Sequence, residues 1–189
     1  DEQSVIPLTV KLFLVALVYF VSGRLGLAIP YVGSHITLIW LPTGIAVAAL
    51  LRWGTLCWLG IFIGAFVTNF SVDANPALDA CIALGTTLGT LLTAWLLRWT
   101  KFQATIDSSK DILFLILAAA MGMLFSASVG VSSLVLFKLL SLQDVGAAWL
   151  SWWAGDFVGV LLAAPLLLNM SIAEFKKIAG QRLEILVWC

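Results

Sequence analysis

The sequence predicts an all-α protein, a polytopic bundle of transmembrane helices, and two observations support this fold class. The chain is 62% hydrophobic and only 11% charged, and its mean hydropathy is +1.09, values far from those of a soluble domain. Its apolar residues form several runs, each long enough to cross a bilayer, rather than one buried core. We therefore expect a single integral-membrane domain over residues 1–189, with about six helices and the start of a seventh.

The first three expected helices are separated by short turns. They span residues 7–29, 36–51 and 55–70. The first is an apolar run with Lys11 near its start and Arg24 near its far end. The second carries Pro42 in its first turns, where proline fits either a helix start or a local break. A tight turn at Gly54 leads into the third helix.

The later expected helices are longer. They span residues 76–99, 111–139 and 146–170, and a partial helix begins at 183. Pro76 suits the first turn of a helix. The run 111–139 is too long for one perpendicular crossing, which predicts a tilt or a bend near residues 126–130, where small side chains weaken the helix. The partial helix would need a further one to return the chain to its starting side, so a parent with about eight helices is expected.

Basic residues predict how the bundle is oriented. If six helices alternate in direction, most lysines and arginines fall at one end, and only Arg24 and Lys138 fall at the other. Positively charged loops tend to remain in the cytoplasm. The N-terminus and the turn at Arg52 are therefore expected to be cytoplasmic.

The last long apolar run contains the most specific pattern in the chain, residues 149–159. Trp149, Trp152, Trp153 and Asp156 fall at helical spacings and share one face. A carboxylate facing lipid is costly, so Asp156 should face other helices or a wet cavity. We expect this face to form the inner wall of a polar pocket that binds a ligand or a proton. The alternative is a structural acid, buried against Arg24 or against hydroxyl and indole donors.

Two other segments are expected to contribute to this pocket. Residues 40–44 place an indole, a proline and a glycine within one and a half turns. They fit an interfacial tryptophan beside a proline-initiated helix, or a locally unwound segment whose N-terminal dipole meets a ligand, and both can hold together. Asn69 is expected either to bond to Asp156 or a ligand, or to cap its own helix. The predicted ligand-binding or signal-sensing residues are Trp40, Pro42, Thr43, Asn69, Trp152, Trp153 and Asp156.

Three pairs of glycines are spaced one helical turn apart, which lets another helix approach closely. These predicted helix-packing residues are Gly60, Gly64, Gly85, Gly89, Gly155 and Gly159. Packing within one bundle is the favoured interpretation, because three such notches lie on three helices. A face for dimerisation is the alternative.

Several functional classes lack support in the sequence. The net charge is zero, so nothing indicates nucleic acid as a partner. The three cysteines lack the spacing of disulfide or metal sites and are interpreted as packing residues. There is one histidine and no catalytic or phosphate-binding motif, so we expect no cofactor, no metal and no enzymatic activity in this domain.

Three blocks of sequence form a combined pattern. The first block is WLPTGIA at residues 40–46, the second is GIFIGAF at 60–66 with Asn69 three residues on, and the third is WWAGDFVG at 152–159 followed by APLL at 164–167. In this order and spacing, which extend from the second expected helix to the sixth, the blocks resemble the membrane-associated sensor domain of the first type, the MASE type one family.

The resemblance implies a sensory, non-enzymatic module of the bacterial inner membrane. It further implies a cytoplasmic output domain after the last helix, a histidine kinase or a diguanylate cyclase. The expected partners are membrane lipid, a small-molecule ligand of unknown identity, the output domain and a second copy in a full-length homodimer. The alternative functions are a small solute-binding subunit of a transporter, which would use a similar pocket, and an anchor that only localises the output domain.

Overall fold

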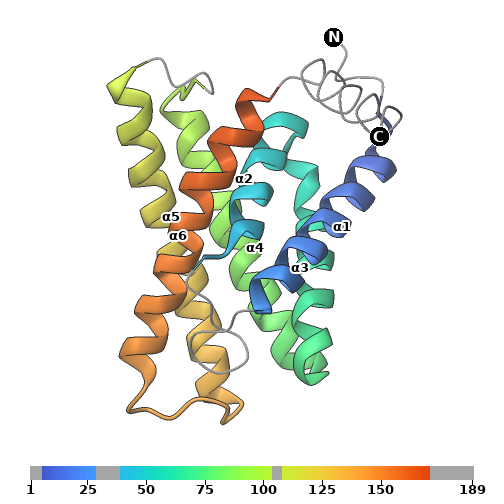
Figure 1. Ribbon diagram of the computed structural model, residues 1–189, viewed down its shortest axis with the longest axis vertical. Helices are drawn as coiled ribbons and strands as arrows, with labels where there is room; N and C mark the ends of the chain where they lie inside the picture. Colours follow the sequence, from blue (N-terminus) through green and yellow to red (C-terminus); the bar gives the residue numbers. More distant parts are fainter. Residues whose placement is uncertain (1–5, 29–38, 104–107, 171–189) are drawn as a thin grey trace, which may run out of the picture.

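The computed structural model describes residues 6–28, 39–103 and 108–170. Within these ranges every secondary-structure element is a helix, which confirms the predicted all-α bundle (Figure 1). One short 3-10 helix, η2, precedes α3. The elements are α1 (Leu8–Leu27), α2 (Leu41–Trp53), η2 (Thr55–Cys57), α3 (Trp58–Asp73), α4 (Pro76–Trp99), α5 (Ser109–Leu136) and α6 (Val145–Asn169).

Five of the helices are long and apolar enough to cross a membrane, and α2 is the exception among the described residues. Its 13 residues extend about 20 Å, whereas the hydrocarbon core of a bilayer is about 30 Å thick. Figure 1 shows that α2 occupies only the upper part of the bundle. The N-terminus of α2 therefore lies at the level of the middle of the long helices.

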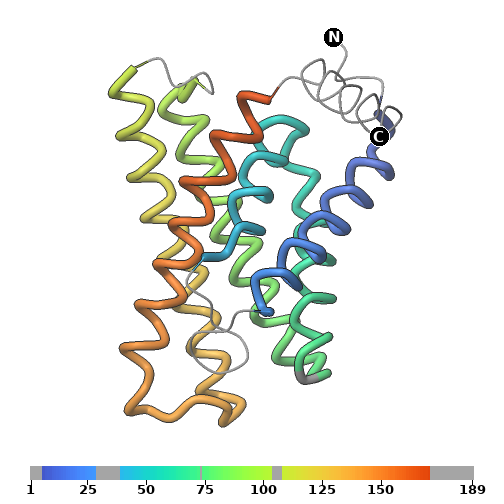
Figure 2. Tube along the Cα trace, in the orientation of Figure 1, coloured from blue at the N-terminus to red at the C-terminus, as the bar shows by residue number. Residues whose placement is uncertain are grey.

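The short helix α2 lies inside the bundle, in contact with α1, α4 and α6. In Figure 2, α5 and α6 lie on one side of it, and α1 and α3 lie on the other. The helix α4 joins the two sides, because it packs against both α3 and α5. Side chains that point inward from α2 are consequently surrounded by protein.

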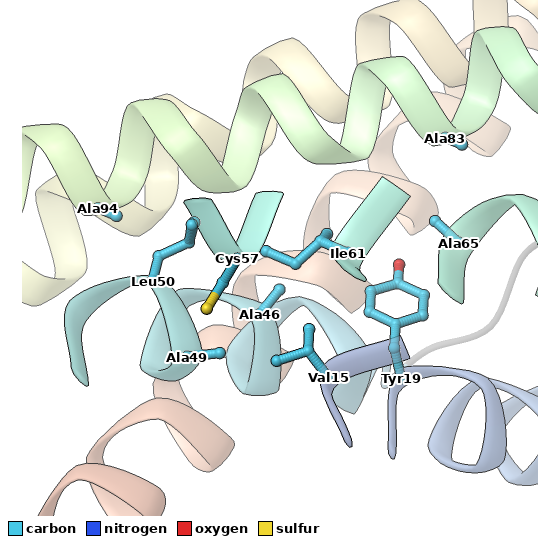
Figure 3. Close-up of a cluster of buried hydrophobic side chains, with 10 residues drawn as sticks. All are labelled: Val15, Tyr19, Ala46, Ala49, Leu50, Cys57, Ile61, Ala65, Ala83 and Ala94. Carbon is cyan, nitrogen blue, oxygen red and sulfur yellow. The ribbon is translucent and has the colours of Figure 1, made fainter. Parts of the chain in front are cut away.

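Much of the core is built from small side chains. The cluster in Figure 3 places Tyr19, Leu50 and Ile61 among alanines from α2, α3 and α4. Small residues let helix backbones approach closely, which is how helices associate in a membrane without a hydrophobic driving force. Tyr19 is only 1% exposed, and its hydroxyl points inward from α1.

The paired glycines lie against other helices of the same chain. Gly60 and Gly64 face α1, Gly85 and Gly89 face α5, and Gly159 faces the residue that precedes α2. A Cβ atom built on any of these five would lie 2.8 Å or less from its nearest neighbour. These residues therefore set the distance between helices within the bundle.

The second helix begins later than the sequence pattern suggested. Residues 36–51 were expected to be helical, but α2 spans Leu41–Trp53, and the described residues Ile39 and Trp40 precede it. The Trp40 N–H donates to the carbonyl oxygen of Gly155 in α6 at 3.0 Å. The chain at Trp40 therefore bonds to another helix, a long-range contact that apolar periodicity does not reveal.

Other boundaries also differ from expectation. The run 111–139 becomes α5, which starts at Ser109, ends at Leu136 and is unbroken, and Lys138 just beyond it has a φ of 62°. The run 55–70 is divided into η2 and α3, and α3 continues to Asp73. The partial helix expected from 183 lies outside the described residues.

Candidate functional site

The N-terminus of α2 docks onto the middle of α6. Besides the Trp40–Gly155 bond, the Thr43 hydroxyl lies 2.7 Å from the carbonyl oxygen of Trp40 and 3.1 Å from that of Asp156. Thr43 is fully buried. We call this contact the α2–α6 joint and define it by Trp40, Thr43, Gly155, Asp156 and Gly159.

Glycine is required on both sides of the joint. A Cβ atom on Gly159 would lie 1.9 Å from the carbonyl oxygen of Trp40, and one on Gly44 would lie 2.1 Å from the carbonyl oxygen of Gly159. No side chain can occupy such a space without separating the helices. The two backbones are therefore in direct contact.

The helices α2 and α6 run in the same direction with a constant register. Three contacts along the pair join residues that are 115 positions apart in the sequence. They are Trp40 with Gly155, Gly44 with Gly159, and Arg52 with Leu167. Because these contacts are spread from the residue before α2 to its last turn, a displacement of the joint would act on the whole pair.

The side chain of Trp40 extends the joint to α1. Its indole nitrogen donates to the Tyr19 hydroxyl at 3.3 Å. Its ring covers Gly23 and Gly26 of α1, where added Cβ atoms would lie 3.4 and 3.2 Å from ring carbons. Thr86 of α4 also lies close to the Tyr19 hydroxyl. Polar side chains from α1 and α4 and the indole just before α2 thus meet in the bundle interior.

Asp156 faces α5 rather than lipid. The residue is 1% exposed, and the Ser126 hydroxyl donates to its carboxylate at 2.6 Å. The indole of Trp152, one turn earlier in α6, also lies close to this carboxylate. Arg24, the cation considered from the sequence, instead donates to the Ser71 hydroxyl at 2.9 Å. The donors around Asp156 are therefore a hydroxyl and an indole.

The tryptophans of α6 divide into two groups. Trp149 and Trp153 stack with ring centroids 6.4 Å apart, and the Trp153 indole donates to the Ala120 carbonyl oxygen at 3.1 Å. Trp152 lies instead against Gly130, where an added Cβ atom would be 2.6 Å from the indole ring. Only Trp152 thus shares the immediate surroundings of Asp156.

Two other predicted residues take different positions. Pro42 is buried in the first turn of α2, where it lacks an N–H that would otherwise need a partner. The Asn69 side chain donates to the Ala65 carbonyl oxygen of its own helix at 2.9 Å. The helix α3 packs against α1 and α4, and Figure 2 shows it across the bundle from α6.

Sequence reasoning missed Tyr19 and Ser126 as members of this site. Tyr19 is one of two tyrosines and lies within an apolar run, which is a signal that a hydroxyl there needs a partner. Ser126 was considered only as a residue that weakens its helix. Its role depends on the packing of α5 against α6, which the sequence does not specify.

The chemistry of the site is hydrogen bonding in apolar surroundings. Among the residues that the structure describes, no three metal-ligating side chains lie close enough to hold an ion. The site instead combines a carboxylate, hydroxyls, indoles and main-chain carbonyls on α1, α2, α4, α5 and α6. Such a network can recognise a polar group, and it also joins the helices that carry it.

Comparison with known proteins supplies the class of the chain. The MASE1 family model matches residues 11–186, which include all of α2 to α6. No curated protein and no solved structure matches the chain significantly. The chain belongs to the MASE1 family of membrane sensory input domains.

Proposed function

We propose that this domain detects a small molecule or another membrane-proximal cue and regulates a cytoplasmic histidine kinase or diguanylate cyclase. The observation that carries the proposal is the α2–α6 joint. A helix too short to cross the membrane starts in the middle of the bundle and is held there beside a buried acid. In a sensor family, such a joint is well suited to convert an altered contact into a shift of helices.

The proposed mechanism is a choice between two packings of the bundle. A cue changes their populations only if it interacts differently with each. The bonds of Thr43 to the Asp156 main chain and of Ser126 to the Asp156 carboxylate belong to the packing described above. A ligand that competes for these donors would favour the other packing, in which α2 and α6 are displaced.

The predicted sensing residues have different roles in this proposal. Trp40, Thr43, Trp152 and Asp156 form or border the joint and would contact the cue or exchange partners. Pro42 fixes where α2 begins, and Trp153 ties α6 to α5.

Asn69 would act indirectly, through the packing of α3 against α1.

In the full-length protein, a homodimer embedded in lipid would bring two output domains together.

The test is to replace Asp156 with asparagine in the full-length protein and to measure output activity in membranes. Asp156→Asn keeps the shape of the side chain and removes the group that can ionise, so basal output should shift about fivefold or more while thermal stability is retained. Asp144→Asn is the matched control, because Asp144 is an exposed acid just before α6. Unchanged output in the Asp156 variant would contradict the proposal.

A further inference from the structure

The C-terminal end of α6 is held by a side chain of α2. Arg52, in the last turn of α2, donates to the carbonyl oxygens of Leu167 and Met170 at 3.1 and 2.9 Å. The last four carbonyl groups of a helix have no partner within it, and a cation near them is favourable. Arg52 therefore caps a helix that is not its own.

Proline makes this cap more important. Pro165 lies inside α6 and lacks the N–H that would otherwise bond to the carbonyl oxygen of Leu161. The last turn of α6 is thus connected to the preceding turns by one hydrogen bond fewer. Its position depends correspondingly more on Arg52.

The two helices are consequently attached at both ends. The α2–α6 joint fixes the start of α2 to the middle of α6, and Arg52 fixes the end of α2 to the end of α6. These attachments are separated by about 20 Å, the length of α2. Between them, Gly44 touches Gly159 and the register stays constant. A helix that is held in this way moves as a rigid strut.

A second arginine caps a neighbouring helix at the same end of the bundle. Arg98, in the last turn of α4, donates to the carbonyl oxygen of Leu50 in α2. The end of α2 thus receives a cation from α4 and supplies one to α6. The hydrogen bonds from α2 to Leu167 and Met170, at the end of α6, are donated by Arg52.

We propose that Arg52 is a positioning residue that carries a displacement of the α2–α6 joint to the segment following Met170. This inference rests on the proposed sensory function, since it names the route by which the site regulates what lies beyond α6. Displacement of the start of α2 pulls its end, and the guanidinium then moves the last turn of α6 with it.

The experiment is hydrogen exchange measured by mass spectrometry on the 189-residue chain in lipid nanodiscs, read at the amides of residues 166–170. The variants are Thr43→Val, Arg52→Gln, Arg52→Lys and the Thr43→Val/Arg52→Gln double variant. Thr43→Val disturbs only the joint, because it removes the hydroxyl and keeps the shape. Lys101→Gln is the control, since it removes an exposed positive charge just after α4 for which no hydrogen bond to α6 is described.

We expect Arg52→Gln to accelerate exchange at 166–170 about tenfold. A hydrogen bond from a charged donor stabilises the closed state of a helix end by a factor of about ten or more in its opening equilibrium. Arg52→Lys should give a smaller increase, because lysine keeps the positive charge but lacks the planar guanidinium whose one nitrogen donates to both carbonyls. Thr43→Val should accelerate exchange about threefold at this remote site in the native background, by loosening the start of the strut. In the Arg52→Gln background it should add nothing.

Two results would overturn the inference. Unchanged exchange at 166–170 in Arg52→Gln would show that the guanidinium does not hold the helix end. Independent, additive effects of Thr43→Val and Arg52→Gln would show that Arg52 does not transmit. Neither result depends on a stimulus or an output domain. Failure of this inference can therefore be distinguished from failure of the sensory proposal, which the Asp156→Asn assay tests.

Discussion

At Gly159, one hydrogen atom in place of a methyl group determines how closely α6 approaches the chain at the start of α2. Gly159→Ala would place a carbon 1.9 Å from the Trp40 carbonyl oxygen, so the helices must separate. Overpacking of this kind costs about 1–3 kcal/mol, and here the neighbour is rigid backbone, so we expect about 3 kcal/mol. The measurement is the change in free energy of unfolding in detergent.

Gly146→Ala is the matched control on the same helix. Nothing lies within 4 Å of a Cβ atom at Gly146, so alanine should leave stability unchanged or raise it by up to about 1 kcal/mol, since alanine favours helix. Equal losses from the two substitutions would show that the close contact at Gly159 is not a determinant of stability.

The bond between Trp40 and Tyr19 allows a double-mutant cycle. Trp40→Phe and Tyr19→Phe each remove one partner of the 3.3 Å bond, and each should cost about 1 kcal/mol for the bond, beside any loss of packing. Because both remove the same bond, the double variant should be less destabilised than the sum of the single ones. Thermal unfolding of the four proteins measures the difference, and strict additivity would exclude coupling.

At this scale the sequence reveals residues that are unusual for their surroundings. Asp156 is the only charged residue in the run 145–170, and lipid would penalise it, so its inward position could be anticipated. Ser126 is an ordinary residue in a transmembrane helix, and only the packing of α5 on α6 makes it the donor to that acid. The hydrogen-bond partner of Asp156 therefore could not be assigned from the sequence, because the arrangement of the helices determines it.

Among the helices, local signals determine some boundaries and distant contacts determine others. The helix α4 spans Pro76–Trp99, where residues 76–99 were expected, because Asn75 caps it and Pro76 fits its first position. The start of α2 has no such local capping bond. It depends on the bond from Trp40 to Gly155, a residue 115 positions away, and apolar periodicity alone placed it too early.

The start of α5 provides a prediction about capping. The Ser108 side chain accepts from the Asp111 N–H at 3.3 Å and donates to the Asp111 carboxylate at 2.7 Å. Ser108→Ala removes both bonds and should cost about 1 kcal/mol, with faster hydrogen exchange confined to the first turn of α5. The neighbouring Ser109→Ala, at the exposed first position of the helix, is the control and should leave exchange there unchanged. Equal exchange in both variants would show that Ser108 is not a cap.

Across the whole molecule, positive charge gathers at one end of the bundle. Figure 1 places the start of α1, the ends of α2, α4 and α6, and the start of α5 at the same end. The basic residues near these positions are Lys11, Arg52, Arg98, Lys101 and Lys110. Arg24 and Lys138 lie near the opposite ends of α1 and α5. The alternation expected from the sequence thus agrees with the course of the helices.

This asymmetry predicts that the Arg52 end faces the cytoplasm, where positively charged loops are retained. Cysteine labelling of the full chain in intact cells tests it. Leu142→Cys, 80% exposed as leucine between α5 and α6, should react with a membrane-impermeant maleimide in intact cells. Gln103→Cys, exposed just after α4, should react only after lysis. The protein without an added cysteine is the control, because it gives the background labelling of the three native cysteines. Inverted labelling of the two variants would place the Arg52 end outside, where the proposed strut could not reach a cytoplasmic output domain.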